Sequence, residues 1–282
     1  MKNKKLSVRV ILPVVMSISI VACIITSMML FSYLFSSYFK RDAVEKMERQ
    51  TNSLTQSLEK EINSINNLVN DIYYQDIKKY DCENMQFKTI MKQKLSNESD
   101  RIYSISLYDV KGNNVWSFGS QETGTVSSKS WFKNANKNIE TIQYGKRKPV
   151  QSDLFNNVMD ISRYVEYIDH GNMKSGILLI EYYTEPIESI LQRYQNKLSA
   201  YCYLVDESNN FLYHPFEKRM ASGLYQEKTV SAALKSNNYI IKNINHEDWL
   251  IERKQIGYTG WNIVVVNSMS NLTIENNRFH YI

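Results

Sequence analysis

The stretch "YLVDESNNFLYHP", residues 203–215, decides the fold because its pattern occurs twice in the chain. It predicts an apolar strand, a polar turn and a second apolar strand, which Pro215 stops. The stretch "YSISLYDVKGNNVWSFG", residues 103–119, has the same form. In addition, "SGILLIEYYTEPIESIL" and "TGWNIVVVNSMSNLTI" each run from a glycine through an apolar strand into a helix start. The same features in the same order predict two structurally similar modules.

The two predicted turns share an aspartate at their entrance. Asp109 and Asp206 each end an apolar strand, where a carboxylate can accept hydrogen bonds from the backbone N–H groups of the turn. Gly112 and Asn209 stand where such a turn needs a positive φ. His214, at the exit of the second hairpin, has no nucleophile or second histidine at a ligand-like spacing. We therefore expect His214 to be architectural, and we expect no catalytic residue, metal site or cofactor.

Charge is concentrated at the N-terminus of the chain. The first thirty-nine residues contain only four charged side chains, which supply +4 of the formal net charge of +5: Lys2, Lys4, Lys5 and Arg9. The body, residues 40–282, is therefore nearly neutral and gives no electrostatic reason to expect nucleic acid as a partner. The basic run "KRK" at 146–148 lies between a glycine and a proline, and we expect it to be a solvated loop.

An uncharged run, "VILPVVMSISIVACIITSMMLFSYLFSSYF", follows at residues 10–39. A bilayer core needs about 20 apolar residues in a helix, whereas the apolar region of a signal peptide has about 7–15. Phe35, Tyr38 and Phe39 are bulky where a cleavage site needs small residues. The run therefore predicts an uncleaved transmembrane helix in the cell membrane. Since long domains translocate largely regardless of charge, we expect a cytoplasmic N-terminus and an extracellular body.

The membrane run is followed by a helical pattern over residues 40–75. Apolar residues recur there at spacings of three and four, and charged and amide residues fill the other faces. The step through Leu54, Leu58 and Ile62 departs from a strict heptad. We expect half of the apolar face to lie against the chain's own domain and half against the helix of a second copy in a homodimer.

Cysteine use leaves two alternatives open. Cys82 and Cys202, both in the predicted extracellular part, could pair in an oxidising compartment. However, Cys202 lies within the apolar strand pattern "AYCYLVD", which favours a buried thiol. No CxxC pair indicates zinc or redox chemistry.

The order of these features resembles a known family. An anchor, a long helix and two α/β modules that contain "LYDVKGNNVW" and "YLVDESNNFLYHP" resemble the double Cache (dCache) sensing domain, which is built from two PAS-like modules. The stretch "SRYVEYIDHGNMKSGILLIEYYTEPIESIL", the second hairpin and "GYTGWNIVVV" resemble YesM-type transmembrane sensor histidine kinases of Firmicutes. The resemblance covers most of residues 10–275. It implies an α+β fold with an N-terminal transmembrane helix that continues into a long helix, followed by two Cache modules with antiparallel sheets.

The resemblance gives the predicted organisation of the chain. The parts are a cytoplasmic tail at 1–9, a transmembrane helix at 10–39, a stalk helix at 40–75, a membrane-distal Cache module at 76–197, a membrane-proximal Cache module at 198–270 and a juxtamembrane segment at 271–282.

The kinases that the chain resembles cross the membrane again and continue into a HAMP linker and a kinase, which acts on a response regulator. This sequence ends at "ENNRFHYI" without a phosphoacceptor histidine box, so we expect it to be the sensing half of a longer protein rather than a natural single-pass one. Chemoreceptors and cyclic-dinucleotide enzymes carry the same sensor and remain alternatives. A membrane-tethered adhesion protein is an alternative from another class.

The resemblance also implies where a ligand binds. Amino-acid-binding relatives use an Arg-x-Trp-aromatic motif in the distal module for the ligand carboxylate and a later acidic residue for its amine. Here the motif has lysine in place of arginine, and a lysine cannot make the bidentate contact with a carboxylate. Gly124 and Asn134 depart from the motif as well, so we expect a sugar or another small polar metabolite. The predicted ligand-binding residues are Lys129, Trp131, Phe132, Tyr144, Arg163, Tyr164 and Glu181.

Three structural expectations accompany this site. Trp131 either lines the pocket or is a core anchor of the module. Ser127-Ser128 is predicted to cap a helix that carries "WFKNANKN". A buried Glu181 carboxylate needs a partner, for which Lys129, Arg163 and a ligand ammonium are the candidates.

Signal transmission is expected to follow from ligand binding in the distal module. Binding would shift the long helix, or a helix that Thr184 caps with Glu185 and Pro186 in its first turn, against its dimer mate. A ligand can shift that equilibrium only by its differential affinity for the two states.

Overall fold

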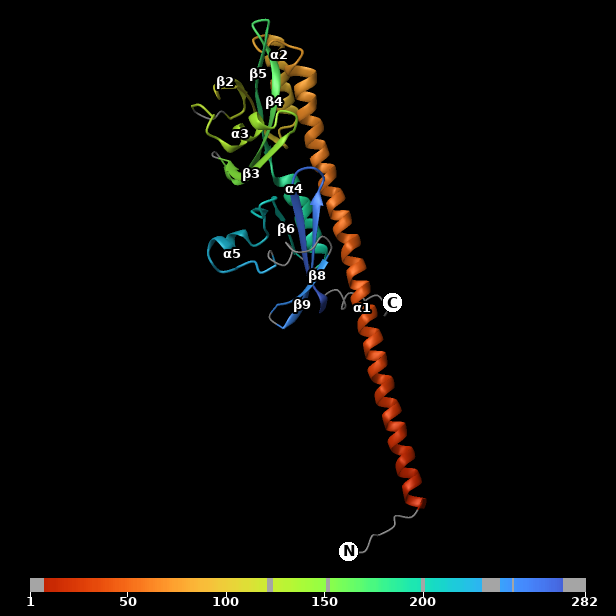
Figure 1. The fold of residues 1–282 in the computed structure, drawn as a ribbon. Coiled ribbons are helices and arrows are strands. Elements are labelled where there is room, and N and C mark those ends of the chain that lie inside the picture. Colours follow the sequence, from red (N-terminus) through yellow and green to blue (C-terminus); the bar gives the residue numbers. More distant parts are fainter. Residues whose placement is uncertain are drawn as a thin grey trace.

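A single long helix is the spine of the protein (Figure 1). The computed structural model describes residues 8–120, 124–150, 153–198, 201–229, 239–244 and 246–270. Helix α1 runs from Val8 to Asp71, which makes it about 96 Å long at 1.5 Å per residue, and continues as the π-helix η1, Ile72–Ile77. The predicted transmembrane and stalk helices are therefore one element. Its N-terminal half is apolar and long enough to cross a membrane, and it extends free of the rest of the protein.

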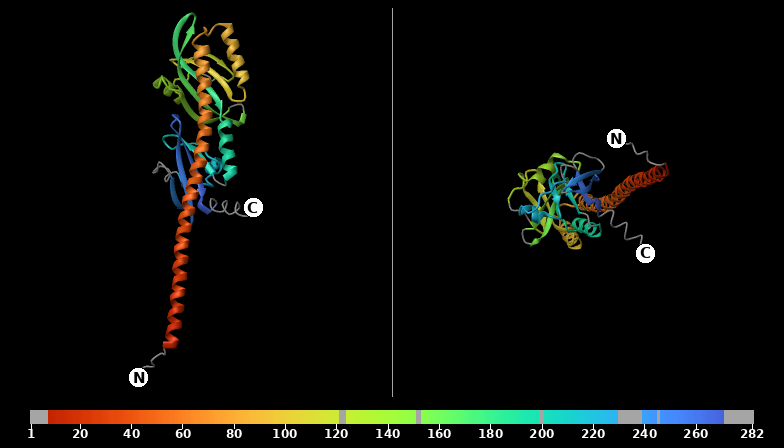
Figure 2. Two further views of the ribbon diagram at one scale, coloured as in Figure 1. Left: turned by 90° about the vertical axis from the view of Figure 1, so that its right-hand side faces the viewer. Right: turned by 90° about the horizontal axis from the view of Figure 1, so that it is seen from below.

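Two five-stranded antiparallel sheets with the same strand order are stacked along α1 (Figure 2). In the distal module, which lies farther from the N-terminus, the order is β2-β1-β5-β4-β3. In the proximal module it is β7-β6-β10-β9-β8. The distal strands are β1 (Ile102–Asp109), β2 (Asn114–Phe118), β3 (Gln143–Val150), β4 (Asp153–Asp169) and β5 (Asn172–Tyr183). The proximal strands are β6 (Tyr201–Val205), β7 (Phe211–Tyr213), β8 (Tyr239–Ile244), β9 (Glu247–Ile256) and β10 (Trp261–Ser268). The predicted α+β fold with two similar modules is confirmed.

Four shorter helices complete the modules. They are α2 (Met85–Asn97), α3 (Ser130–Lys137), α4 (Glu185–Leu198) and α5 (Glu217–Ala221). Helix α4 connects the modules and begins directly after Thr184, as predicted. The Thr184 hydroxyl donates to Oε1 of Glu188 at 2.6 Å, and the Glu188 N–H donates to the Thr184 carbonyl at 2.9 Å. The predicted juxtamembrane segment, 271–282, lies outside the described residues.

The two predicted hairpins occupy equivalent positions in the two sheets. Asp109 Oδ1 accepts from the N–H groups of Lys111 and Asn113 at 2.9 and 2.8 Å, and Asp206 Oδ1 accepts from the Asn210 N–H at 2.8 Å. In both turns an asparagine amide also donates to Oδ2 of the aspartate, at 2.9 and 2.8 Å. The prediction from the repeated pattern is therefore confirmed.

The turns also adopt the predicted backbone conformation, with φ of +87° at Gly112 and +63° at Asn209. Glycine is favoured at Gly112 for a second reason, because an added Cβ would lie 2.6 Å from the backbone nitrogen of Ser127. The aspartate-led turn thus fixes the register of the first two strands in each module.

Both modules pack on one apolar face of α1 and the first residue of η1. The buried residues on this face follow the spacing of three and four residues that the sequence shows, and they belong to a hydrophobic core that extends into both sheets: Met47, Leu54, Leu58, Ile62, Ile65, Val69 and Ile72. Where the modules meet, the Tyr144 ring of β3 contacts the Trp261 ring of β10, with centroids 5.4 Å apart. Because both modules pack on one helix, a movement of α1 relative to either module disturbs a shared core.

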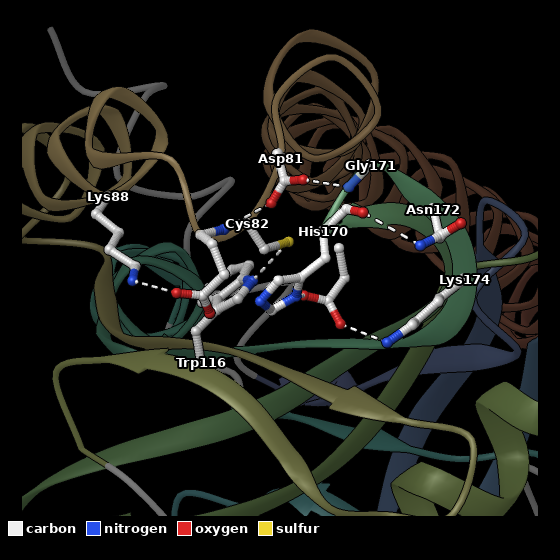
Figure 3. Close-up of polar contacts among 10 residues, drawn as sticks. Asp81, Cys82, Lys88, Trp116, His170, Gly171, Asn172 and Lys174 are labelled. Carbon is white, nitrogen blue, oxygen red and sulfur yellow. Dashed lines mark hydrogen bonds and ion pairs between the residues drawn. The ribbon is translucent and has the colours of Figure 1, made fainter.

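The cysteines of the modules are free. Cys82 and Cys202 are both buried, as the strand pattern around Cys202 predicted, and burial raises their pKa values to about 11 and about 12. The Trp116 indole donates to the Cys82 sulfur at 3.3 Å (Figure 3). Beside it, Asp81 fastens the tip of the β4–β5 hairpin, because its Oδ2 accepts from the Gly171 N–H at 2.7 Å. These contacts are structural, since the thiols are inaccessible and protonated at neutral pH.

His214 lies inside the proximal module. Its side chain is 1% exposed and its Nε2 lies 3.1 Å from Glu227 Oε2, while the Phe216 N–H donates to Nδ1 at 3.1 Å. Because Nδ1 accepts, Nε2 carries the proton and donates to the glutamate. The Tyr203 and Phe211 rings pack on the imidazole at centroid distances of 5.3 and 5.1 Å. Both ring nitrogens are used in holding the module together, as expected for an architectural residue.

Candidate functional site

The candidate site lies on the face of the distal sheet that α3 covers, opposite α1. Successive residues of a strand point to opposite faces, and β4 shows this directly. The Ser162 hydroxyl donates to the Trp131 carbonyl of α3 at 3.1 Å, whereas the next residue, Arg163, bonds to Asn70 of α1 and Tyr74 of η1. The face on which Ser162 lies is formed by α3 with β3, β4 and β5, and we call it the α3 face.

Aromatic side chains form one half of the α3 face. Trp131 and Phe132 are each 4% exposed, and the Trp131 ring lies 5.5 Å from Tyr108 and 5.8 Å from Phe132 between centroids. Tyr164, half-buried on β4, packs on the same cluster. The Trp131 indole Nε1–H is buried and has no acceptor among the described residues. A buried donor without an acceptor costs about 1–3 kcal/mol, which a ligand oxygen at this position would remove.

A buried charge cluster forms the other half. Asp160 of β4 and Glu181 of β5 are direct cross-strand partners, and the Lys148 ammonium of β3 lies 2.7 Å from Asp160 Oδ1 and 2.8 Å from Glu181 Oε1. The Ser104 hydroxyl of β1 donates to the other Glu181 oxygen. Burial disfavours the ammonium, but the two carboxylates outweigh that cost and raise the pKa of Lys148. The lysine thus holds together two carboxylates that would otherwise repel each other.

The partner of Glu181 corrects two expectations. Neither Lys129 nor Arg163 pairs with this carboxylate, because Lys129 is exposed at the start of α3 and Arg163 points to the other face of the sheet. The run at 146–148 is also not a solvated loop: it belongs to β3, whose pairing with β4 carries Lys148 onto the α3 face. A local sequence pattern could not predict that Lys148 is the partner, because the pairing of neighbouring strands decides which lysine reaches the carboxylates.

The start of α3 differs from the prediction by one to two residues. Lys129 itself, with an extended backbone, is the N-cap, and its side chain makes no capping bond. The predicted Ser127-Ser128 cap is therefore wrong. Lys129 nevertheless stands at the helix entrance and Trp131 in the first turn, so the motif occupies a turn leading into a helix, as its spacing requires.

The seven predicted ligand-binding residues divide into two groups. Trp131, Phe132, Tyr164 and Glu181 come together on the α3 face, and Lys129 stands at its edge. Tyr144 and Arg163 lie instead on the opposite face of the sheet, which packs on α1 and which we call the α1 face. The Tyr144 hydroxyl donates to Asn66 Oδ1 at 2.5 Å, and the Arg163 guanidinium donates to Tyr74 Oη at 3.0 Å and stacks 4.7 Å from the Tyr73 centroid.

Sequence reasoning missed three polar residues of the α3 face, namely Ser104, Lys148 and Asp160. The sequence did contain one signal for Asp160 and for a cation near it. Asp160 interrupts the apolar pattern of β4, much as Glu181 interrupts that of β5, and two buried carboxylates call for a cation nearby. The hydroxyl of Ser104 gave no signal, because serine is common on strand surfaces.

The comparisons agree with this architecture. The family model of the Cache domain, dCache_1, matches residues 35–274. The chain belongs to the Cache domain family. No curated protein matches this Cache chain significantly.

Solved structures of chemoreceptor domains share the fold. The ligand-binding domain of the amino acid chemoreceptor PctC of Pseudomonas aeruginosa PAO1, in complex with GABA, superposes with a TM-score of 0.59 at 15% identity, over 79% of this chain and 99% of that domain. The domain of Pseudomonas fluorescens CtaA with L-leucine gives 0.58 at 11% identity, over 84% and 99%. The P. aeruginosa PctB domain with L-Arg gives 0.58 at 9% identity, over 81% and 96%. The protein is therefore a Cache sensor domain behind a candidate membrane helix.

Proposed function

We propose that the protein is the extracellular sensing half of a transmembrane two-component histidine kinase, and that it binds a sugar or another small polar metabolite on the α3 face. The observation that carries the ligand site is the buried Trp131 Nε1–H, which lacks an acceptor among the described residues. A hydroxyl or carbonyl oxygen of a ligand would supply that acceptor.

The charge cluster supports a ligand without an ammonium group. The chemoreceptor domains described above hold GABA, L-leucine and L-arginine, each of which carries an amine. In this protein the Lys148 ammonium already lies between Asp160 and Glu181. The ammonium of an amino acid would have to displace Lys148, or else add a second cation to carboxylates that are already paired. Hydroxyl groups could instead donate to remaining lone pairs of these carboxylates without displacing the lysine.

Transmission is proposed to run through α1. The distal sheet contacts α1 through Tyr144 and Arg163, and the proximal sheet contacts it through β9, where the Lys254 ammonium donates to Asn52. A ligand that favours one packing of β3 and β4 would shift α1 against a second copy of itself in a homodimer. The proposed modules are residues 76–197 and 198–270, and the output is a kinase that acts on a response regulator.

A chemoreceptor output is the second candidate, because the similar solved structures are chemoreceptor domains. A cyclic-dinucleotide enzyme would use the same sensor. Autophosphorylation assays on the protein encoded by the whole gene would separate a kinase from both.

Thermal unfolding of the chain in lipid nanodiscs tests the ligand site. We would measure it with panels of monosaccharides and of amino acids. A sugar at 100 times its dissociation constant is expected to stabilise the protein by about 2.7 kcal/mol, and Trp131→Phe is expected to remove that shift. Trp116→Phe is the matched control, because Trp116 is also a buried indole, 7% exposed, and packs on Phe87 on the opposite face.

Two results would contradict the proposal. If amino acids stabilise the wild type and sugars do not, the ligand class is wrong. If the two tryptophan variants lose the ligand shift equally, the site is not on the α3 face.

A further inference from the structure

A concave site lies on the other face of the distal sheet, where both modules meet α1. It is a groove of about 930 Å³. One wall is a stripe of polar residues along α1 and η1, spaced three to four apart and therefore on one side of the helix: Glu59, Asn63, Asn66, Asn70 and Tyr74. From Glu59 to Tyr74 the stripe extends over about 22 Å of helix. The groove is thus long enough for an elongated ligand.

The opposite wall comes from both modules. The distal module contributes Tyr144, Arg163 and the loop at 140–142. The proximal module contributes Gln255 near the end of β9 and Tyr258 in the turn between β9 and β10. The Gly257 N–H of that turn donates to Glu59 Oε1 at 3.2 Å, which fastens the turn to α1. A ligand in the groove would therefore touch the stalk helix and both modules at once.

The lining favours a neutral ligand with many hydroxyl groups. Asn63 offers both an amide N–H donor and a C=O acceptor, while Asn66 and Asn70, whose Oδ1 atoms accept from Tyr144 and Arg163, keep their N–H donors for the oxygens of ligand hydroxyls. The charged residues that line the groove are two glutamates and one arginine. Arg163 is already held by Asn70, Tyr74 and the two tyrosine rings beneath it, so the described lining of the groove has no further cation to attract an anion.

Two exposed aromatic rings border this polar lining. Tyr258 is fully exposed at 107%, and Tyr74 is 46% exposed. Exposed aromatic rings beside a groove offer flat apolar faces, and the C–H faces of a sugar ring are the matching surface. Tyr144 adds a third ring from β3. A stripe of asparagines between tyrosines is also a poor seam for a helix of a second copy, which would need apolar residues there.

We propose that this groove is a second ligand site, distinct from the α3 face, and that it binds an oligosaccharide. Its occupant would hold the two modules in one arrangement on α1. A chain of sugar rings could thereby bias the same stalk helix that the α3 face is proposed to control. The proposal does not depend on the ligand of the α3 face, because none of the residues named for the groove belongs to that face.

The test is a calorimetric titration of the full chain in nanodiscs with maltotriose, xylotriose and chitotriose. At least one trisaccharide is expected to bind. Tyr258→Ala and Asn63→Ala are each expected to weaken that binding at least tenfold without loss of folding, because both side chains are exposed. Tyr239→Ala, which removes an exposed tyrosine from β8, is the matched control and should leave binding unchanged. Trp131→Phe should leave it unchanged as well.

Three outcomes would overturn the inference. The first is that none of the three trisaccharides binds, or that spermidine binds the groove in their place. The second is that Trp131→Phe abolishes binding while Tyr258→Ala does not, which would move the site to the α3 face. The third is that Asn63→Cys forms a disulfide between two copies, which would make the groove the seam of a dimer.

Discussion

Replacing Lys148 by methionine tests the charge cluster of the α3 face most sharply. Methionine keeps an unbranched side chain of similar length but removes the ammonium that lies 2.7 Å from Asp160 and 2.8 Å from Glu181. The side chains of these carboxylates are 12% and 9% exposed, and they are cross-strand partners. In Lys148→Met the two carboxylates lose the ammonium that lies between them, and the Ser104 hydroxyl still donates to Glu181.

The size of the effect follows from burial. Removing one partner of a buried ion pair typically destabilises a protein by about 3–5 kcal/mol. Because the Lys148 side chain is 33% exposed, water screens part of the interaction, and we expect a loss of about 3 kcal/mol, at the low end of that range. For a protein of this size that corresponds to a fall in Tm of roughly 6–12 °C.

The pH dependence has a defined sign. The pKa of Lys148 is raised in the folded protein, so its stabilising contribution is fully present below the unfolded pKa of about 10.4 and is lost only as pH rises through the higher folded value. The wild-type contribution is therefore constant between pH 5 and pH 9. In Lys148→Met that contribution is absent, so the deficit against the wild type should be the same throughout this range.

Differential scanning fluorimetry of the full chain in nanodiscs, from pH 4 to pH 9, measures both effects. Lys146→Met is the matched control, since Lys146 lies on the same strand and is exposed. We also expect Lys148→Met to gain binding of GABA, whose ammonium can take the vacated position. If the two variants lose equal stability, or if the deficit of Lys148→Met changes between pH 5 and pH 9, the reasoning about the cluster is refuted.

Three further predictions concern other parts of the protein. Trp131→Ala should cost about 3–5 kcal/mol in a chemical denaturation because the ring is 4% exposed, whereas an unchanged midpoint would show that the ring is not part of the core. Burial opposes the charge of Glu227, but hydrogen bonds from His214 and Thr229 outweigh it and lower its pKa to about 2. Its stabilising contribution should therefore be present above about pH 4.3 and disappear as pH falls towards 2, and Glu227→Gln should flatten that part of a Tm-versus-pH curve. Protease added to intact cells should degrade residues 40–282, and survival of that part until lysis would reverse the proposed orientation.

The sequence predicted the parts of the fold that local patterns determine. The long helix followed from an uncharged run joined to a spacing of three and four residues. The two modules followed from an aspartate-led turn between short apolar strands, because Asp109 and Asp206 make their bonds within four residues of chain. Such features need no knowledge of tertiary contacts.

The parts that were not predicted depend on contacts distant in sequence. Lys148 meets Glu181 only because β3, β4 and β5 are neighbours in a particular register, which no local pattern contains. Tyr144 and Arg163 were grouped with Trp131 by residue type, but alternation along β3 and β4 turns them to the α1 face. Helix α3 has its N-cap at Lys129, one to two residues after the predicted serine cap, because the preceding loop extends to Lys129.

Hydrogen exchange with and without the sugar that stabilises the protein most would test the central claim directly, because it locates the ligand without any substitution. We predict slower exchange of the amides of α3, Ser130–Lys137, and of β3, Gln143–Val150, with a smaller effect along α1. Slower exchange confined to other segments, or no change in α3 and β3 at saturating sugar, would contradict the assignment of the α3 face as the sensing site.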